Sequence, residues 1–218
     1  MRRLLQGVRV FQHRVFPERR THFEALAKGQ APSTLFITCS DSRIVPELIT
    51  QTAPGELFVL RNAGNLVPPW TAEHTGEAAT IEYAVKVLKV REIVVCGHSH
   101  CGAMNGLLNP DSVEELPAVK RWLAHATRTL EEVTNLPLDG AGSDASDDLL
   151  TTAVKCNVMV QLAHLRTYPA VAEAESRGEL ELQGWFYRFE TGETFELDGA
   201  SRQFVSVNEK FESEIPVV

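Results

Sequence analysis

Three short apolar runs stand out in the first half of the chain, separated by more polar stretches. They are TLFITC (34–39), ELFVLRN (56–62) and EIVVCG (92–97). Because they are rich in Val, Ile, Leu and Phe and show little polar alternation, they are typical of strands covered on both faces. Near the end, ELELQGWFYRFETGETFELDG (179–199) alternates around ETGE, which predicts a hairpin.

Helical periodicity lies between and after these strands. Residues 73–90 and 116–133 each repeat apolar side chains at steps of three and four, which predicts helices with one buried face. A further helix is predicted over 149–166. The segment 137–148 is rich in Gly, Ser and Asp and poor in apolar residues, which indicates a surface loop.

The N-terminal residues form one face of a helix, because Leu4, Val8, Phe11 and Val15 recur at steps of four, three and four. The Arg-rich start could be read as a transit peptide, but no export-type apolar stretch with a small-residue cleavage site follows. We therefore expect a packed amphipathic helix in a cytoplasmic protein.

Strands that alternate with helices predict an α/β fold: a single domain with a central, mostly parallel sheet flanked by helices. The 218 residues fit one domain. Within 1–218 we expect an N-terminal helical arm over about 1–30, an α/β core over 31–198 and a C-terminal tail over 199–218.

Composition excludes some classes of partner. The net charge of −8 argues against nucleic acid and anionic membranes, since both reward clustered Lys and Arg. No apolar run approaches the roughly 20 residues of a membrane-spanning helix. The chain has four cysteines, and without an export signal we expect them to be reduced thiols rather than disulfides.

Candidate chemistry concentrates in VVCGHSHCGAMNG, at the end of the third predicted strand. Ligands of open parallel sheets bind outside the carboxyl ends of strands. Cys96 lies within the apolar run and is expected to pack as a small hydrophobe, and Gly97 is expected to break the strand. His98 and Cys101 would then converge across the turn into a short helix. The competing interpretation pairs His98 with His100 along an extended strand.

Cys39 is the natural third ligand, because it ends the first predicted strand and neighbouring strands present their ends together. One imidazole and two thiolates suit Zn²⁺, and three protein ligands leave a fourth position for water, as in catalytic zinc sites. The alternative is a closed structural site in which a fourth donor comes from His100, Cys96 or Cys156.

Two charged residues follow Cys39 in CSDSR. Asp41 and Arg43 would share a face in an extended segment, either as a weak surface ion pair or as a carboxylate held beside the metal by a guanidinium fork. In the second case Asp41 stays ionised and orients a zinc-bound hydroxide toward an electrophile. Two thiolates weaken zinc as a Lewis acid, so we expect activity to rise on the alkaline side of neutral.

The blocks CSDSR, PGELFVLRNAGNLVPP, GEAATIEYAVKVLKV, IVVCGHSHCGAMNGLL and GELELQGWFYRFETGE resemble the β-class carbonic anhydrases, in order and spacing, from about residue 4 to about 198. The resemblance implies one Zn²⁺ per chain, held by Cys39, His98 and Cys101, and an Asp41–Arg43 dyad. It also implies reversible hydration of CO2 to bicarbonate and a proton by attack of zinc-bound hydroxide. The protein would be a homodimer that can assemble into a tetramer or octamer.

The resemblance is to the plant-type (type I) members, as found in bacteria or cyanobacteria, and it extends to the substrate pocket. Gln30 stands where such members have a Gln that donates a hydrogen bond to the substrate. Phe58 and Tyr83 match the pocket aromatics, and Gly102 matches the Gly after the second Cys ligand. Ala63 replaces a bulkier aliphatic residue, which is expected to widen the pocket.

The resemblance places this pocket at a dimer interface, so Gln30, Phe58 and Tyr83 would not all come from the zinc-bearing subunit. The N-terminal helices would then pack on the dimer partner, although packing on their own subunit stays open. Phe36 replaces a Trp that the other bacterial subtype uses in a non-catalytic bicarbonate site, so no such regulatory site is expected.

Three other functions are compatible with parts of this sequence to different degrees. A related zinc enzyme could hydrolyse carbonyl sulfide or carbon disulfide, which are linear like CO2. A non-catalytic zinc protein or thiol sensor would need Cys96 or Cys156 for its metal. A nucleotide-binding protein is disfavoured because no G-x-G-x-x-G or P-loop pattern follows a strand. The same chemistry would also serve in a carbon-concentrating compartment.

Overall fold

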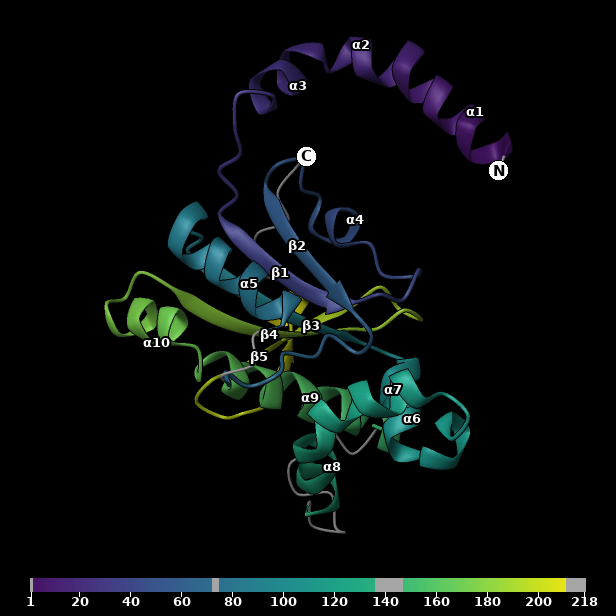
Figure 1. The fold of residues 1–218 in the computed structure, drawn as a ribbon, viewed down its shortest axis with the longest axis vertical. Coiled ribbons are helices and arrows are strands. Elements are labelled where there is room, and N and C mark those ends of the chain that lie inside the picture. Colours follow the sequence, from purple (N-terminus) through teal and green to yellow (C-terminus); the bar gives the residue numbers. More distant parts are fainter. Residues whose placement is uncertain (1, 72–74, 136–146, 211–218) are drawn as a thin grey trace.

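The computed structural model describes residues 2–71, 75–135 and 147–210. Its centre is a six-stranded sheet in the order β2-β1-β3-β4-β5-β6 (Figure 1). The first four strands pair in parallel, and β5 and β6 add two antiparallel partners at one edge. The strands are β1 (Thr34–Cys39), β2 (Leu57–Asn62), β3 (Glu92–His98), β4 (Glu181–Tyr187), β5 (Thr194–Leu197) and β6 (Phe204–Ser206).

The three apolar runs are confirmed as the neighbouring strands β2, β1 and β3, of which β1 and β3 are central and β2 is a half-buried edge strand. The alternating segment is confirmed as the β4–β5 hairpin. The expectation that Gly97 breaks the third strand is wrong, because β3 pairs with β4 through Gly97 as far as His98. A Cβ at Gly97 would lie 2.6 Å from Val154 Cγ1. Glycine is therefore needed here for the close approach of a helix to the strand.

Helices cover both faces of the sheet. One face packs on α5 (Gly76–Tyr83), α9 (Leu149–Leu165) and α10 (Pro169–Ser176) through the side of β1 that carries Leu35. The other face carries Phe36 and packs against the segment around α4 (Pro46–Thr50). The alternation of side chains along β1 between two clusters explains its uninterrupted apolar sequence.

The predicted helices are present with changed boundaries. The helix expected over 73–90 comprises α5 and the π-helical turn η2 (Ala84–Leu88) in its described part. The helix expected over 116–133 is divided into α7 (Pro117–Leu123), η4 (Ala124–Ala126) and α8 (Thr127–Thr134). The loop predicted over 137–148 lies outside the described residues except for its last two. The remaining helices of the core are α6 (Gly102–Leu108), η3 (Pro110–Val113) and α11 (Val207–Lys210).

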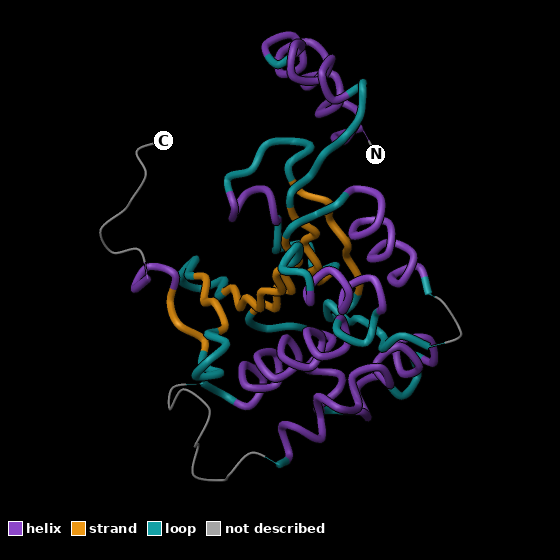
Figure 2. Tube along the Cα trace, turned by 90° about the vertical axis from the view of Figure 1, so that its left-hand side faces the viewer, coloured by secondary structure: helices purple, strands orange, loops and turns teal. Residues whose placement is uncertain are grey.

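The N-terminal helices form an arm that stands away from the sheet (Figures 1 and 2). None of the residues in its four segments is buried, and Leu4 is 76% exposed. The arm meets the core near its end, where the His22 ring donates a hydrogen bond to the Pro54 carbonyl (3.0 Å). Its segments are α1 (Arg2–Val10), η1 (Phe11–Val15), α2 (Phe16–Glu18) and α3 (Arg20–Leu26).

Within the described ranges, no helix combines the length and the apolar character that crossing a bilayer requires.

Candidate metal centre

Two adjacent strand ends and one helix start bring three soft donors together. Cys39 ends β1, His98 ends β3 and Cys101 immediately precedes α6. Their ligand atoms all lie within 4.8 Å of one another, and the residues are 6%, 0% and 1% exposed, respectively. The structure thus brings together the three predicted ligands in a group that could hold a metal ion.

The other candidate donors lie elsewhere. His100 has a left-handed backbone (φ 56°) that turns its exposed ring away to pair with Glu190. Cys96 and Cys156 are buried in separate apolar clusters, and burial raises the pKa of Cys156 to about 11. Among the described residues, no fourth His, Cys, Asp or Glu joins the group of three.

The His98 ring is arranged as a metal ligand would be. Its Nδ1–H donates to the Ser99 carbonyl at 2.8 Å, which leaves the lone pair on Nε2. Nε2 is buried and has no hydrogen-bond partner. A buried nitrogen without a partner is costly in a folded protein, and a cation bound between Nε2 and the two sulfurs would remove that cost.

The two thiols influence each other's ionisation. The side-chain hydrogen bond from Cys101 lowers the pKa of Cys39, with smaller contributions from His98 and from the Gly64 N–H, which donates to Cys39 Sγ at 3.3 Å. The same contact, together with burial, raises the pKa of Cys101. The contact between the two thiols therefore favours ionisation of Cys39 and disfavours ionisation of Cys101.

Helix α9 holds the loop that carries Gly64. The Asn157 amide donates to the Gly64 carbonyl (3.0 Å), and the Val67 N–H donates to Gln161 Oε1 (2.8 Å). Asn157 and Gln161 are themselves joined by a hydrogen bond of 2.8 Å. Gly64 adopts φ +81°, a conformation that favours glycine. This buried polar contact places the Gly64 N–H against the Cys39 sulfur.

Asp41 and Arg43 form a bidentate pair beside the cysteines. Arg43 Nε donates to Asp41 Oδ1 (2.9 Å) and Arg43 Nη2 donates to Oδ2 (2.7 Å). The prediction that they share a face of an extended segment is wrong in its geometry, because a turn brings them together and adds a bond from the Arg43 N–H to Oδ1 (2.9 Å). The guanidinium holds the pKa of Asp41 well below its usual range.

Sequence reasoning missed Arg61, which organises the segment between Cys39 and the α4 helix. Its Nε donates to the Cys39 carbonyl (3.0 Å), and its Nη2 donates to the carbonyls of Asp41 (2.6 Å) and Ile44 (2.9 Å). The available signal was a lone charged residue inside the apolar run ELFVLRN. Arg61 is exposed on the edge strand β2, and its guanidinium donors bind carbonyl groups of the neighbouring segment.

Three of the predicted pocket residues do not lie at the metal cluster of their own chain. Phe58 pairs with Leu35 at the start of β1, roughly 13 Å along the strand from the Cys39 end. The Tyr83 ring contacts the Phe58 ring, with centroids 6.1 Å apart. Gln30 precedes β1 in the chain, before the end of the strand that is opposite Cys39.

The other predicted pocket residues do lie beside the cluster. Ala63 directly follows β2, and its carbonyl accepts a hydrogen bond from Trp122 Nε1 (2.7 Å). Gly102 follows Cys101 at the start of α6, and a Cβ added there would meet no atom within 4 Å.

Phe36, the residue that stands where the other bacterial subtype has a Trp, is buried and packs edge-on against Trp185, with ring centroids 5.8 Å apart.

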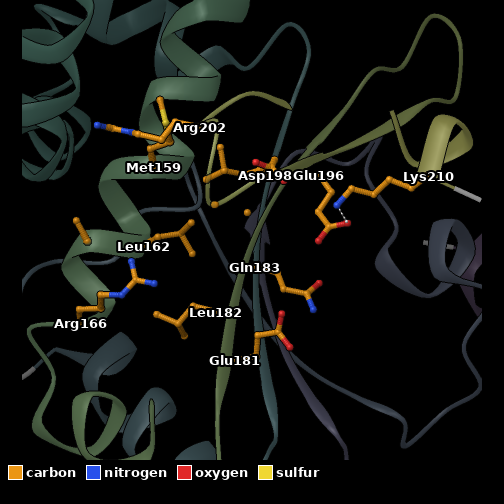
Figure 3. A pocket seen from close by; sticks show the side chains of 14 residues that line it. Met159, Leu162, Arg166, Glu181, Leu182, Gln183, Glu196, Asp198, Arg202 and Lys210 are labelled. Atoms are coloured by element: carbon orange, nitrogen blue, oxygen red, sulfur yellow. Dashed lines mark hydrogen bonds and ion pairs between the residues drawn. The ribbon is translucent and has the colours of Figure 1, made fainter. Parts of the chain in front are cut away.

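A cavity of about 550 Å³ lies between α9 and the strands β4 and β5 (Figure 3). Several of its charged residues are already paired, as Lys210 Nζ is with Glu196 (2.9 Å) and Arg166 is with Glu175 (3.0 Å). The cavity lies near the start of β4, whereas the three donors lie at the opposite end of β1 and β3. It therefore forms no part of the metal centre.

Fold and cluster together define an α/β protein whose parallel sheet presents a Cys–His–Cys group at its carboxyl edge, beside an arginine-held carboxylate. Comparison with known proteins gives the same class in more detail. The family model described as Carbonic anhydrase matches residues 34–194, which contain the three donors and the dyad. The chain belongs to the carbonic anhydrase family, in its β class.

The relatives agree over nearly the whole chain. A carbonic anhydrase of Pseudomonas aeruginosa is 50% identical over 96% of this chain and 93% of its own length. One of Synechococcus elongatus is 47% identical over 96% of this chain and 76% of its own length. The structure of the β-carbonic anhydrase CcaA superposes with a TM-score of 0.87 at 47% identity, covering 94% of this chain and 98% of that one.

Proposed function

We propose that this protein catalyses the zinc-dependent, reversible hydration of CO2 to bicarbonate and a proton. The observation that carries the proposal is the buried group of Cys39, His98 and Cys101, in which His98 Nε2 has no protein partner. Membership of the carbonic anhydrase family supports the reaction.

We infer that one Zn²⁺ per chain binds the two sulfurs and Nε2, because one imidazole and two thiolates are a donor set that suits zinc. When bound, the ion would lower the pKa of a water molecule in its fourth position and so supply a nucleophile. The Ser99 carbonyl keeps the His98 ring in the required tautomer, as outer partners of metal-ligating histidines do.

Asp41 would act as an acceptor only. Its two oxygens already receive hydrogen bonds from Arg43, and its lowered pKa keeps it ionised at neutral pH. A carboxylate in this state can accept one more hydrogen bond from a reacting oxygen and thereby aim that oxygen at the CO2 carbon. The fork from Arg43 also keeps Asp41 from turning to the metal ligands.

We further propose that the working unit is a homodimer, with tetramers or octamers as possible larger assemblies. Support comes from Gln30, Phe58 and Tyr83, which could line a substrate pocket only if a second copy contributed some of them. The exposed apolar face of the N-terminal arm is a surface that a partner would bury. Two β-carbonic anhydrases of Sordaria macrospora, to one of which this chain is 31% identical, are described as tetrameric.

The free state of all four cysteines supports a reducing compartment. We therefore propose that the protein works in the cytoplasm, including any carbon-concentrating compartment inside it.

Stopped-flow measurement of CO2 hydration, with zinc content determined on the same sample, tests the proposed reaction. A sulfide-release assay with carbonyl sulfide should run in parallel. We expect one zinc per chain and CO2 hydration far above sulfide release. Sulfide release without CO2 hydration would replace the proposed substrate, and zinc with neither activity would indicate a non-catalytic zinc protein.

A further inference from the structure

Glu190, in the turn between β4 and β5, contacts the two residues that separate the metal ligands His98 and Cys101. Its Oε2 accepts a hydrogen bond from Ser99 Oγ at 2.9 Å. Its other carboxylate oxygen pairs with Nε2 of the His100 ring. Glu190 is far from this turn in sequence, by 91 and 90 positions, so the β4–β5 hairpin itself delivers it.

The Ser99–His100 turn needs such support from outside. His100 has φ 56°, in the left-handed region that residues other than Gly occupy rarely and at a cost in energy. The hairpin supplies further contacts: the Ser99 N–H donates to the Tyr187 carbonyl and the Phe189 N–H donates to Ser99 Oγ, each at 2.9 Å. The turn is therefore held from the hairpin side by both backbone and side chain.

The same turn reaches the Asp41–Arg43 pair. The His100 carbonyl accepts a hydrogen bond from Arg43 Nη2 at 3.1 Å, and that nitrogen also donates to Asp41 Oδ2. The Arg43 guanidinium lies over the Phe189 ring, 4.6 Å from its centroid. The Arg43 guanidinium is thus held at one edge by the hydrogen bond to the His100 carbonyl and on one face by the Phe189 ring.

We propose that Glu190 is a positioning residue for CO2 hydration: it holds the Ser99–His100 turn so that the His100 carbonyl aligns Arg43, and through Arg43 the Asp41 carboxylate. This inference rests on the proposed function. It assigns no contact between Glu190 and the metal or the substrate.

A simple surface ion pair is the competing explanation, since the Glu190 side chain is 49% exposed and such pairs contribute little. Two observations favour positioning. Glu190 contacts two consecutive residues, one of them through a neutral hydroxyl, and one of these residues is in a strained conformation. A surface pair also has no reason to influence Arg43, whereas the His100 carbonyl joins the two sites directly.

The test compares three variants in stopped-flow CO2 hydration at saturating buffer, so that proton removal to solvent does not limit the rate. Glu190→Ala should lower kcat/KM by about tenfold, the range found when partners of an active-site group are lost, with zinc unchanged at one per chain. Glu190→Gln should retain most activity, because its amide oxygen still accepts from Ser99. Glu193→Ala, a matched control in the same hairpin, should leave activity unchanged.

A double-mutant cycle shows whether Glu190 acts through the dyad. Arg43→Met removes the fork and its bond to the His100 carbonyl, so adding Glu190→Ala to Arg43→Met should cost little further. An equal loss in both backgrounds, a wild-type-like Glu190→Ala, or loss of zinc would each overturn the inference. Ser99→Ala gives a second measure, with a loss expected in the same direction.

The outcomes separate this inference from the proposed function. Wild-type protein without CO2 hydration would contradict the proposed function itself. Active wild type with an unaffected Glu190→Ala variant would contradict the positioning role alone.

Discussion

At the scale of single residues, the chemistry depends on which polar atoms already have a hydrogen-bond partner in the protein. Both Asp41 oxygens receive hydrogen bonds from Arg43, whereas His98 Nε2 receives none. Because the folded pKa of Asp41 lies below the roughly 3.9 of an unfolded chain, its stabilising contribution is present above that pH and is lost only as the pH falls through the folded value. Asp41 therefore does not titrate near neutral pH.

The first prediction concerns Asp41 itself. Asp41→Asn should lower kcat/KM for CO2 hydration by about 100-fold, because an amide cannot act only as an acceptor and the pair with Arg43 loses its charge. Zinc content should stay at one per chain, since Asp41 is not among the three donors. Stopped-flow kinetics with metal analysis measures both quantities, and full activity in the variant would remove the proposed role of the dyad.

The second prediction concerns pH. Two thiolates cancel the charge of Zn²⁺ and make it a weaker Lewis acid than neutral histidines would, so kcat/KM should rise with pH on the alkaline side of neutral. Asp41 cannot produce this rise, because its pKa is lowered and it is already ionised. A rate profile already flat from pH 6 upward would contradict this account of the ligands.

The third prediction separates the four cysteines. Cys39→Ser should lose zinc, because a hydroxyl replaces a sulfur that lies within 4.8 Å of the other donors. Cys96→Ser and Cys156→Ser serve as controls, since both side chains are buried in other clusters. They should retain one zinc per chain by elemental analysis. Loss of zinc from either control would favour a closed site or a thiol sensor.

At the scale of elements, helix α9 links the sheet to the metal centre. Val154 and Val158 pack closely on Gly97 of β3, and the polar residues Asn157 and Gln161 hold the loop after β2. One helix therefore determines both how closely β3 packs against it and where the Gly64 N–H lies. This explains why α9 carries buried polar residues in an otherwise apolar sequence.

The fourth prediction tests this link. Asn157→Leu should leave the Gly64 carbonyl and the Gln161 amide without their partners and should destabilise the fold by about 1–3 kcal/mol. Urea unfolding monitored by circular dichroism measures the change, with Thr152→Ala on the same helix as the control. A free energy of unfolding equal to wild type would show that the contact contributes nothing.

At the scale of the whole molecule, the N-terminal arm is the part whose apolar face is not buried within a single chain. Leu4, Leu5, Val8 and Phe11 are among its exposed apolar side chains. A partner that covered this face would bury a substantial apolar area. The proposed homodimer accounts for this face and for the distance of Gln30 and Phe58 from the cluster of their own chain.

The fifth prediction concerns this assembly. The double substitution Leu5→Glu and Val8→Glu should dissociate the dimer, because it places two charges in the buried interface, and activity should fall with it. Analytical ultracentrifugation gives the oligomeric state, and Gln6→Glu, which adds a charge to the same helix, is the control. A variant that stays dimeric would show that the arm packs elsewhere.

The sequence by itself determined the main elements and predicted Cys39, His98 and Cys101 as donors, whereas the exclusion of His100 came from the structure. Uninterrupted apolar runs predict buried strands such as β1, and the rule that parallel strands present their carboxyl ends together brings Cys39 to His98 and Cys101. These are local patterns combined with one topological rule, so periodicity and spacing suffice.

Only the tertiary structure decided the supports of these donors. That β3 continues through Gly97 depends on a helix more than fifty positions away in the chain. Arg61 binds backbone carbonyls, and Glu190 binds side chains, of segments distant in sequence. Neither a hydrogen bond to a distant carbonyl nor a close helix approach has any periodic signature in sequence. Such contacts exist only once the sheet order places the segments side by side.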